Sequence, residues 1–262
     1  MSMVYKNILY EEEGKVATVT LNRPEKRNAL SLALMQEMID LLKMLRVKRE
    51  IQVVILRGNG PAFCAGHDMG EMVGEDKGIN HFREIFGVCT EMMLLIHKIP
   101  QPVIAQVHGI ATAAGCQLVA ACDLAIASSD ARFATPGVKI GLFCTTPMVP
   151  LVRAIGRRRA MKMLLTGNFI SAADAERYGL VNEVVPLEEL EKKTRELATE
   201  IASYSGWTVG IGKEAFYNQI DMEEKQAYFF AREVIASNCL TYDAQEGMRA
   251  FLEKRKPAWK NQ

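Results

Sequence analysis

Over the first 190 residues or so, the pattern of apolar and polar positions switches repeatedly between that of strands and that of helices. Short apolar runs predict strands at residues 5–10, 16–21, 51–57, 103–107 and 124–127. Apolar residues at helical spacing predict helices at residues 32–45, 82–97, 115–121, 157–165 and 171–178. From residue 187 onward the pattern is almost wholly helical, with interruptions at Gly206, Gly210 and Gly212. This order predicts an α/β core followed by helices free to pack elsewhere.

Two glycine turns follow buried strand-like runs. Residues 63–68 (Phe-Cys-Ala-Gly-His-Asp) come soon after the apolar run at 53–56, and residues 113–117 (Ala-Ala-Gly-Cys-Gln) follow the run at 102–109. Each predicts a strand that passes through a tight turn into a helix. Such a turn leaves backbone N–H groups free to bind an oxygen that carries negative charge. In the first turn Asp68 and Glu71 have capping-box spacing, which favours a structural role for Asp68.

Composition and charge narrow the class of protein. The chain has 262 residues, of which 49% are hydrophobic and 24% charged, and its net charge is +1. These values are ordinary for a globular protein and argue against a nucleic-acid partner. The basic run at 157–159 is interpreted as a solvated helix start. Six cysteines without CxxC spacing predict reduced, mostly buried thiols, and the four histidines show no metal-ligand spacing, so we expect no metal.

The beginning of the chain lacks the signals of a targeting segment. Residues 1–6 contain neither an apolar core nor an Arg/Ser-rich amphipathic stretch. The nearest approach to a membrane span, at residues 111–129, contains Gln117 and Asp123. The sequence therefore predicts a cytoplasmic protein without a membrane partner.

The ordered motifs resemble those of the enoyl-CoA hydratase/isomerase (crotonase) family over nearly the whole chain. The matching segments, which include both glycine turns, are residues 20–30, 63–68, 102–109, 115–123, 164–181 and 246–255. The resemblance implies an α/β fold, a crotonase-type spiral of repeated ββα units, with a C-terminal helical region that builds trimers, often paired into hexamers. On this basis residues 1–195 form the spiral core with the thioester site, and residues 196–262 form the trimerisation region.

The resemblance also implies a CoA thioester as substrate, with no tightly bound cofactor. Carried over by position, the thioester oxygen would lie between the backbone N–H groups of His67 and Ala114. The positions implied to contact CoA are Lys26, Arg27, Ala29, Ala65, His67 and Met69, joined by Phe251 and Lys254 from an adjacent protomer. Where the family has a lysine shortly after the first turn, this sequence has Gly70.

Both glutamates of the hydratase-type members are missing. The first position is Gln117 and the second is Gly137, and no glutamate occurs between Glu91 and Glu176. A glutamine amide can hold a water but cannot exchange a proton near neutral pH. Since loss of one acid/base group removes roughly 10²–10⁴ in rate, we expect enolate-type chemistry other than efficient hydration, such as isomerisation, decarboxylation or thioester cleavage.

Other polar groups beside the turns allow more than one interpretation. The His67 imidazole either touches the thioester and transfers a proton, or only packs while its backbone binds. Phe143, Cys144 and Thr145, with Gly137, occupy pocket positions of the family. Cys144 would need a base partner to act as a nucleophile, so a buried thiol is favoured.

Three functions stay open at this point. The first is an enzyme of enolate chemistry in which His67 or a water near Gln117 transfers the proton. The second is a non-catalytic acyl-CoA binder. The third is a true hydratase whose carboxylate comes from elsewhere, such as Glu71, Glu75 or Asp76.

Overall fold

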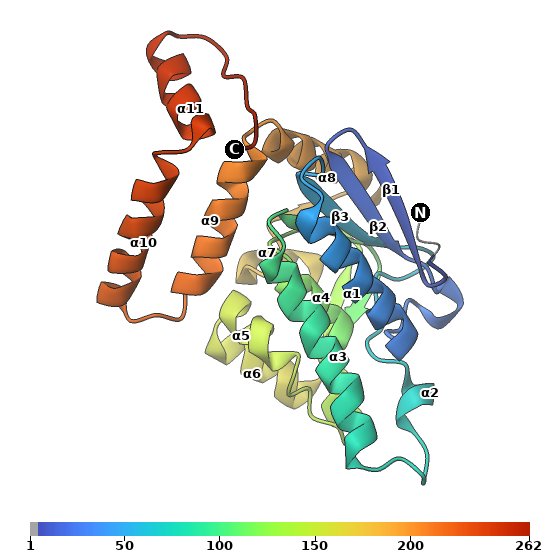
Figure 1. Cartoon of the computed structure of the whole chain (residues 1–262). Coiled ribbons are helices and arrows are strands. Elements are labelled where there is room, and N and C mark those ends of the chain that lie inside the picture. The colour runs from blue at the N-terminus through green and yellow to red at the C-terminus, as the bar shows by residue number, and fades with distance from the viewer. Residues whose placement is uncertain (1–4) are drawn as a thin grey trace.

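A six-stranded sheet forms the centre of the computed structural model, which describes residues 5–262. Residues 1–4, part of the segment in which we read no targeting signal, lie outside the described residues. The strand order is β1-β2-β3-β4-β6-β9. The strands span Ile8–Glu13 (β1), Val16–Leu21 (β2), Val53–Gly58 (β3), Val103–Val107 (β4), Leu124–Ser128 (β6) and Glu183–Val185 (β9) (Figure 1).

All neighbouring strands of this sheet are parallel except the first pair. Every residue of β2 and β4 is buried, as expected for parallel strands covered on both faces. The prediction for β2 is confirmed, whereas β1 lies three residues later than predicted. The reason is the hairpin through Gly14, which pairs Glu13 with Val16 and draws three glutamates into an exposed edge strand.

A smaller sheet of three strands carries the second glycine turn. Its order is β5-β7-β8, with β5 at Ile110–Thr112, β7 at Arg132–Ala134 and β8 at Ile170–Ser171. β5 and β7 are parallel, and β7 and β8 are antiparallel. Because β5 leads directly into a helix that begins at Ala114, this sheet fixes where that helix starts.

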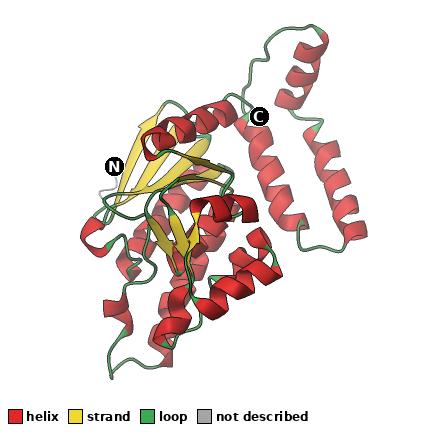
Figure 2. Ribbon diagram, turned by 180° about the vertical axis from the view of Figure 1, so that it is seen from behind, coloured by secondary structure: helices red, strands yellow, loops and turns green. Residues whose placement is uncertain are grey.

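Within residues 5–262 there are eleven α-helices, and the first eight pack around the sheets (Figure 2). They span Leu32–Val47 (α1), Met69–Met72 (α2), Ile79–Lys98 (α3), Ala114–Ala121 (α4), Met148–Ile155 (α5), Arg157–Thr166 (α6), Ala172–Tyr178 (α7), Leu187–Ala202 (α8), Gly206–Gln219 (α9), Glu224–Asn238 (α10) and Tyr242–Leu252 (α11). The predicted caps are confirmed: Ser31 and Ser171 accept from backbone N–H groups three residues on, and Gly179 ends α7 at φ 87°.

The prediction that glycines interrupt the last helical stretch is wrong for two of the three. Gly210 and Gly212 lie inside α9, and only Gly206 lies at a helix end. A Cβ on Gly210 would lie 2.9 Å from the Cβ of Pro100. This glycine therefore allows α9 to approach the end of α3 closely instead of breaking the helix.

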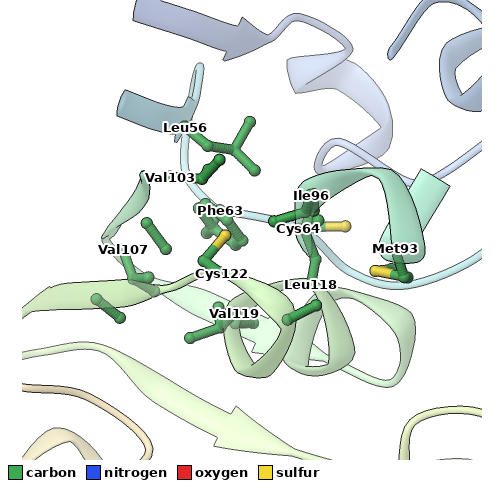
Figure 3. Packing of buried hydrophobic residues seen from close by; sticks show 14 of the residues in the cluster. Leu56, Phe63, Cys64, Met93, Ile96, Val103, Val107, Leu118, Val119 and Cys122 are labelled. Atoms are coloured by element: carbon green, nitrogen blue, oxygen red, sulfur yellow. The ribbon is translucent and has the colours of Figure 1, made fainter. Parts of the chain in front are cut away.

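The largest hydrophobic core cluster packs against the inner side of the glycine turns. Phe63 and Cys64 of the first turn are fully buried and pack among Leu118 and Val119 of α4 and the strand residue Val107 (Figure 3). On the other face of the sheet, α8 buries Ala198 and Ala202 against β3 and β4. A rigid core thus lies directly beneath the turns.

The last three helices, α9, α10 and α11, extend away from the sheets (Figures 1 and 2). The boundary proposed between residues 195 and 196 falls inside α8, whose side chains belong to the sheet core, so the extended part begins with α9. Over residues 5–262, none of the helices combines the length and apolarity that a membrane span requires.

Candidate functional site

The first glycine turn pairs with β5, which leads into the second. The N–H of Cys64 donates to the carbonyl oxygen of Ile110 at 3.1 Å, and the N–H of Thr112 donates to the carbonyl oxygen of Cys64 at 3.0 Å. The Thr112 hydroxyl also donates to the carbonyl oxygen of Ala65 at 3.0 Å. These bonds hold residues 63–68 alongside the strand that ends at the second turn.

The two turns approach so closely that neither central glycine has room for a side chain. Gly66 has φ +100°, and a Cβ there would lie 2.9 Å from the Cβ of Ala113 and 3.4 Å from the backbone nitrogen of Ala114. A Cβ on Gly115 would lie 2.1 Å from the carbonyl oxygen of Cys64. The sequence has a glycine at each point of closest approach, and the structure gives the reason.

The backbone N–H of His67 points away from the segment that precedes α1. The N–H of Leu30 donates to the carbonyl oxygen of Gly66 at 2.7 Å, and the N–H of Asp68 donates back to Leu30 at 3.0 Å. In extended backbone alternate N–H groups point to opposite sides, so the His67 N–H faces away from Leu30. Within residues 5–262 it donates to no protein acceptor.

Among the residues that the structure describes, the backbone N–H of Ala114 likewise has no acceptor, for a different reason. Ala114 is the first residue of α4, and the first N–H of that helix to find a backbone acceptor is that of Gln117, which donates to Ala113 at 3.0 Å. Ala113 itself is held at φ 50° and ψ −118°, a strained conformation for a residue with a Cβ. Two adjoining turns thus each offer a donor, one of them at a helix N-terminus, where negative charge is favoured.

The His67 side chain is half-buried and neutral. Its ring packs edge-on against Phe86 of α3, with ring centroids 5.2 Å apart. Its Nε2 is buried and has no hydrogen-bond partner within the described residues. Burial lowers the pKa of the imidazole to about 4. The side chain is therefore uncharged at neutral pH, with one nitrogen free for a ligand.

Gln117 lies on α4 one turn after Ala114 and is 4% exposed. Its Oε1 is buried without a partner in residues 5–262. An unpaired buried acceptor is costly to retain, typically by about 1–3 kcal/mol, and such groups mark places where a donor from a ligand or water belongs.

Gly137 has no room for the glutamate that the family places there. A Cβ at this position would lie 2.0 Å from the carbonyl oxygen of Leu142 and 2.8 Å from the Sγ of Cys144. The N–H of Leu142 also donates to the carbonyl oxygen of Gly137 at 2.9 Å. The segment at 142–144 thus occupies the space into which a longer side chain would extend.

The other pocket positions lie on or beside that segment with different exposures. Cys144 is 8% exposed, and burial raises the pKa of its thiol, which keeps it protonated and unreactive. Phe143 is 37% exposed, and Thr145 is exposed, with its N–H bonded to the carbonyl oxygen of Phe143. Five of the six cysteines are buried as thiols, with Cys239 the exposed exception.

The positions implied to contact the CoA nucleotide lie on the segment next to the first turn. Lys26 and Arg27 are exposed and Ala29 is buried. The N–H of Ala65 donates to the carbonyl oxygen of Arg27 at 3.0 Å, which joins this segment to the turn. Asn28, a motif residue to which the sequence assigned no role, anchors it: its Nδ2 donates to the carbonyl oxygens of Asn59 and Ala62, each at 2.8 Å.

Met69 starts α2 and is 44% exposed beside the turn. Phe251, at 82% exposure, and Lys254 lie at the far end of the chain, on and just after α11, and Figure 1 shows α11 well away from α2. One protomer therefore does not bring these two residues to its own turns.

The predicted capping box is wrong in one of its two bonds. Asp68 caps α2 through Gly70 and forms a 2.8 Å ion pair with Arg23, so its structural role is as expected. Glu71, however, accepts from the N–H of Leu32 at 2.8 Å instead of from Asp68. The partner helix α1 lies close enough to take this carboxylate, which the local spacing did not reveal.

A cavity of about 1070 Å³ opens between α9 and the helices α3, α4 and α5. Gln117 lines it, together with Met93 and Leu94 of α3 and Trp207 of α9. Sequence reasoning missed this cavity because it depends on how the C-terminal helices pack, which a local pattern does not specify.

A buried polar cluster holds α9 beside the cavity. The Nζ of Lys213 lies 2.6 Å from the Oδ2 of Asp123 and donates to the carbonyl oxygens of Ile96 and Gln101. The Tyr217 hydroxyl donates to the Oδ1 of Asp123 at 2.8 Å. Asp123 therefore anchors α9 to the core. Among residues 5–262, no group of three or more metal-binding side chains gathers at one place.

The comparisons with known proteins agree on one family. The sequence model described as enoyl-CoA hydratase/isomerase matches residues 11–262. The chain is 44% identical to the enoyl-CoA hydratase domain-containing protein 3, mitochondrial, of Rattus norvegicus, over 95% of this chain and 82% of that protein.

Solved structures give the same result. An enoyl-CoA hydratase from Mycobacterium smegmatis superposes with a TM-score of 0.94 at 44% identity, covering 97% of this chain and 99% of that one. The human enoyl-CoA hydratase domain-containing protein 3 also gives 0.94, at 42% identity, over 97% of this chain and 100% of that one. The expected α/β crotonase-type fold with C-terminal helices is confirmed.

The prediction of a cytoplasmic location is wrong. Several relatives, including the rat protein, are named as mitochondrial, which points to the mitochondrion instead. The prediction rested on the missing targeting pattern at the start of the sequence, and that start does not decide the location.

Proposed function

This chain belongs to the enoyl-CoA hydratase/isomerase family, and from that premise we propose that it binds acyl-CoA thioesters and polarises their carbonyl group. The observation that carries the proposal is the pair of free N–H groups, from His67 and Ala114, on two turns in direct contact. A thioester oxygen between them would gain negative charge as an enolate forms. Removing one donor of this kind typically lowers a rate by about 10²–10³.

We propose enolate-type chemistry other than efficient hydration. Gln117 cannot donate or accept a proton near neutral pH, and Gly137 is enclosed by the segment at 142–144. The carboxylates closest in sequence to the first turn are already engaged, Asp68 with Arg23 and Glu71 with Leu32. This engagement argues against a hydratase whose acid/base has moved to either of them.

The proton in this chemistry would pass through His67 or through a water held by Gln117. The unpartnered Nε2 of His67 supports a hydrogen bond to the ligand. A pKa of about 4 makes the imidazole a weak base that stays neutral, so its expected action is to relay a proton without keeping it.

We propose that the CoA part lies along Lys26, Arg27, Ala29, Ala65 and Met69, in accordance with the family. The exposed cations at Lys26 and Arg27 suit phosphates. Completion of this site by Phe251 and Lys254 requires a neighbouring protomer, because one protomer holds them apart. Self-association is supported by α10, which has no buried residue and exposes Tyr228 and Phe229.

A non-catalytic acyl-CoA binder is the second candidate. The observation that favours it is the neutral character of three side chains of the proposed site: His67, Gln117 and Cys144 all stay uncharged at neutral pH. Such a site binds a polarised carbonyl without a strong proton donor or acceptor.

Two measurements on one preparation separate these candidates. Calorimetric titration with butyryl-CoA should give saturable binding, and mass spectrometry in D₂O should show exchange of the protons next to the thioester carbonyl. The variant His67→Gln should bind with similar affinity and exchange at least tenfold more slowly, whereas His108→Gln, whose imidazole contacts the carbonyl oxygen of Gly60, should match the parent. Binding without exchange would establish the binder instead, and absence of binding would refute both.

A further inference from the structure

The segment that carries the proposed CoA phosphate contacts is held in a strained conformation. Arg27 and Asn28 are consecutive and both have positive φ, at 50° and 54°, in the left-handed region that residues with a Cβ rarely adopt. The cost is roughly 1–3 kcal/mol for a residue such as Arg27 and less for an asparagine. Strain of this kind persists only where the surrounding structure holds it, and it gathers at ligand sites. The groups that hold this segment are therefore candidates for a functional role.

Arg23 closes the segment on itself. The N–H of Asn28 donates to the carbonyl oxygen of Arg23 at 2.9 Å, and the N–H of Arg23 donates to the Oδ1 of Asn28 at 2.9 Å. These two hydrogen bonds close a small ring of residues, named the 23–28 ring. Lys26 and Arg27 are exposed on it.

The Arg23 side chain joins the 23–28 ring to the first glycine turn. Its Nη1 donates to the carbonyl oxygen of Ala29 at 2.6 Å, just after the strained pair, and its Nη2 donates to the Oδ2 of Asp68 at 2.8 Å. The side chains of Arg23 and Asp68 are each 16% exposed, so water reaches the pair only in part. Asp68 directly follows His67, whose N–H is one of the two proposed thioester donors. One guanidinium thus connects the proposed phosphate contacts with the proposed thioester donor.

The carboxylate at the far side of this connection is charged at neutral pH. The pKa of the Asp68 carboxyl is lowered, first of all by its hydrogen bond from Arg23 and in smaller part by the charge of Lys26. Lys26 is thus close enough to Asp68 to act on it. Asp68 also accepts from the N–H of Gly70 at 3.0 Å, so the connection continues into α2, where Met69 lies.

The fold does not depend on this guanidinium alone. The side chain of Asn28 anchors the 23–28 ring to the loop after β3, and the N–H of Ala65 donates to the carbonyl oxygen of Arg27. A variant that lacks the guanidinium should therefore fold. It loses the two charge-assisted bonds to Ala29 and Asp68, which leaves the exposed cations less precisely fixed relative to the first turn.

On the basis of the proposed function, we propose that Arg23 is a positioning residue, which holds the cations for the CoA phosphates at a fixed distance from the turn that polarises the thioester. Both halves of one CoA thioester can then bind at once. A looser 23–28 ring would have to be ordered on binding, and that cost would lower the affinity for the nucleotide half. Glu25, exposed on the same ring, offsets one of the cations, so recognition of phosphate depends on where the cations are held and not on an excess of charge.

The test compares two thioesters that share the acyl and pantetheine parts. Butyryl-CoA carries the nucleotide, and butyryl-pantetheine lacks it. Calorimetric titration of the parent should give an affinity for butyryl-CoA about tenfold or more above that for butyryl-pantetheine. In Arg23→Gln this ratio should fall about fivefold or more, while the affinity for butyryl-pantetheine stays within about twofold of the parent value. A purely structural role of Arg23 would lower the stability, or both affinities alike, and would leave the ratio unchanged.

Arg57→Gln is the matched control. Arg57 is also half-buried and charge-paired, but its partners are Thr20, Glu11 and Glu191, none of which belongs to the 23–28 ring or to the first turn. This variant should keep the parent ratio of the two affinities.

A second variant keeps the test decisive if Arg23→Gln is poorly folded. Arg23→Lys retains a cation opposite Asp68 but lacks the fork that also reaches Ala29, so its ratio should fall as well, by about twofold or more. An unchanged ratio in the variants that fold would overturn the inference, as would an equal loss of affinity for both thioesters or a parent that binds both equally. The proposed function would stay intact in each of these cases. Failure of the parent to bind butyryl-CoA would overturn both.

Discussion

Gly115 lies so close to Cys64 that a Cβ on the glycine would be 2.1 Å from the cysteine's carbonyl oxygen. These two residues belong to different turns, fifty-one positions apart by their residue numbers, and their contact brings the His67 and Ala114 N–H groups to the same place. The geometry of the proposed thioester site thus depends on a backbone contact, which side-chain substitutions elsewhere leave in place.

Replacement of Gly115 by alanine should destabilise the protein severely. The new methyl group would overlap a backbone carbonyl that is fixed by its bond from Thr112, so we expect a loss of about 3 kcal/mol or more in the free energy of unfolding. Urea denaturation measures this loss. The matched control is Gly87→Ala in α3, where a Cβ meets nothing within 4 Å, and a gain of about 0.5–1 kcal/mol is expected. Similar stability for the two variants would contradict the close contact between the turns.

Replacement of Ala113 by glycine should stabilise the protein. Ala113 is held at φ 50°, a conformation that costs a residue with a Cβ about 1–3 kcal/mol, whereas a glycine adds about 0.4–1 kcal/mol of unfolded-state entropy. The expected net gain is about 1 kcal/mol, measured by urea denaturation. Ala120→Gly, in the same helix, should instead lose about 0.5–1 kcal/mol. A loss in the first variant would show that Ala113 is not strained.

The half-buried imidazole of His67 should make stability depend on pH. Its pKa falls from 6.5 in the unfolded chain to about 4 in the folded protein, so between these values the unfolded state binds a proton that the folded state does not. Stability should therefore fall as the pH drops through this window, by up to about 3 kcal/mol, and level off below it.

The variant His67→Gln isolates this contribution, because His97 also has a pKa lowered by burial and remains in both proteins. The free energy of unfolding of each protein, measured across the window, gives the difference. The parent should lose more stability on acidification than the variant. Parallel curves would mean that the imidazole is solvated, and the account of its enclosure against Phe86 would fail.

Loss of the ion pair between Asp123 and Lys213 should destabilise α9 more than the sheets. Asp123→Asn leaves the Lys213 ammonium, whose side chain is 6% exposed, without its counter-charge, so a loss of about 3–5 kcal/mol is expected. The double variant Asp123→Asn/Lys213→Met should recover part of it, because no unpaired buried charge remains. Hydrogen exchange should show the loss first in α9. If the double variant lost as much stability as the sum of the losses in the single variants Asp123→Asn and Lys213→Met, the two side chains would not be coupled.

The sequence predicted several helix caps and one strand well because local chemistry determines them. Ser31, Ser171 and Gly179 cap helices at the predicted places, and β2 has the predicted bounds. Gly66 and Gly115 were recognisable because only glycine fits where two backbones touch. The free N–H groups followed from that geometry.

The features that the sequence did not reveal depend on long-range packing. Lys213 lies ninety positions from Asp123 by residue number, and nothing in α9 distinguishes it from a surface lysine. The closure of the segment at 142–144 over Gly137 is a local exception: Leu142 bonds back to Gly137, which the residue pattern did not reveal. Glu71 has the spacing of a capping box yet serves α1, since the tertiary contact offers a better partner.

The most direct test of the account is the steady-state rate of crotonyl-CoA hydration, measured beside calorimetric binding and with the product identified by mass. We predict saturable binding with hydration far below the usual enzyme range of about 1–10³ s⁻¹. Gln117→Glu restores one carboxylate at an unpaired buried position and should raise the rate by roughly 10² or more, while Gln117→Leu should not. A parent rate inside that range would contradict the account, because it would require a free acid/base group, whereas Asp68 and Glu71 beside the first turn are engaged with Arg23 and Leu32.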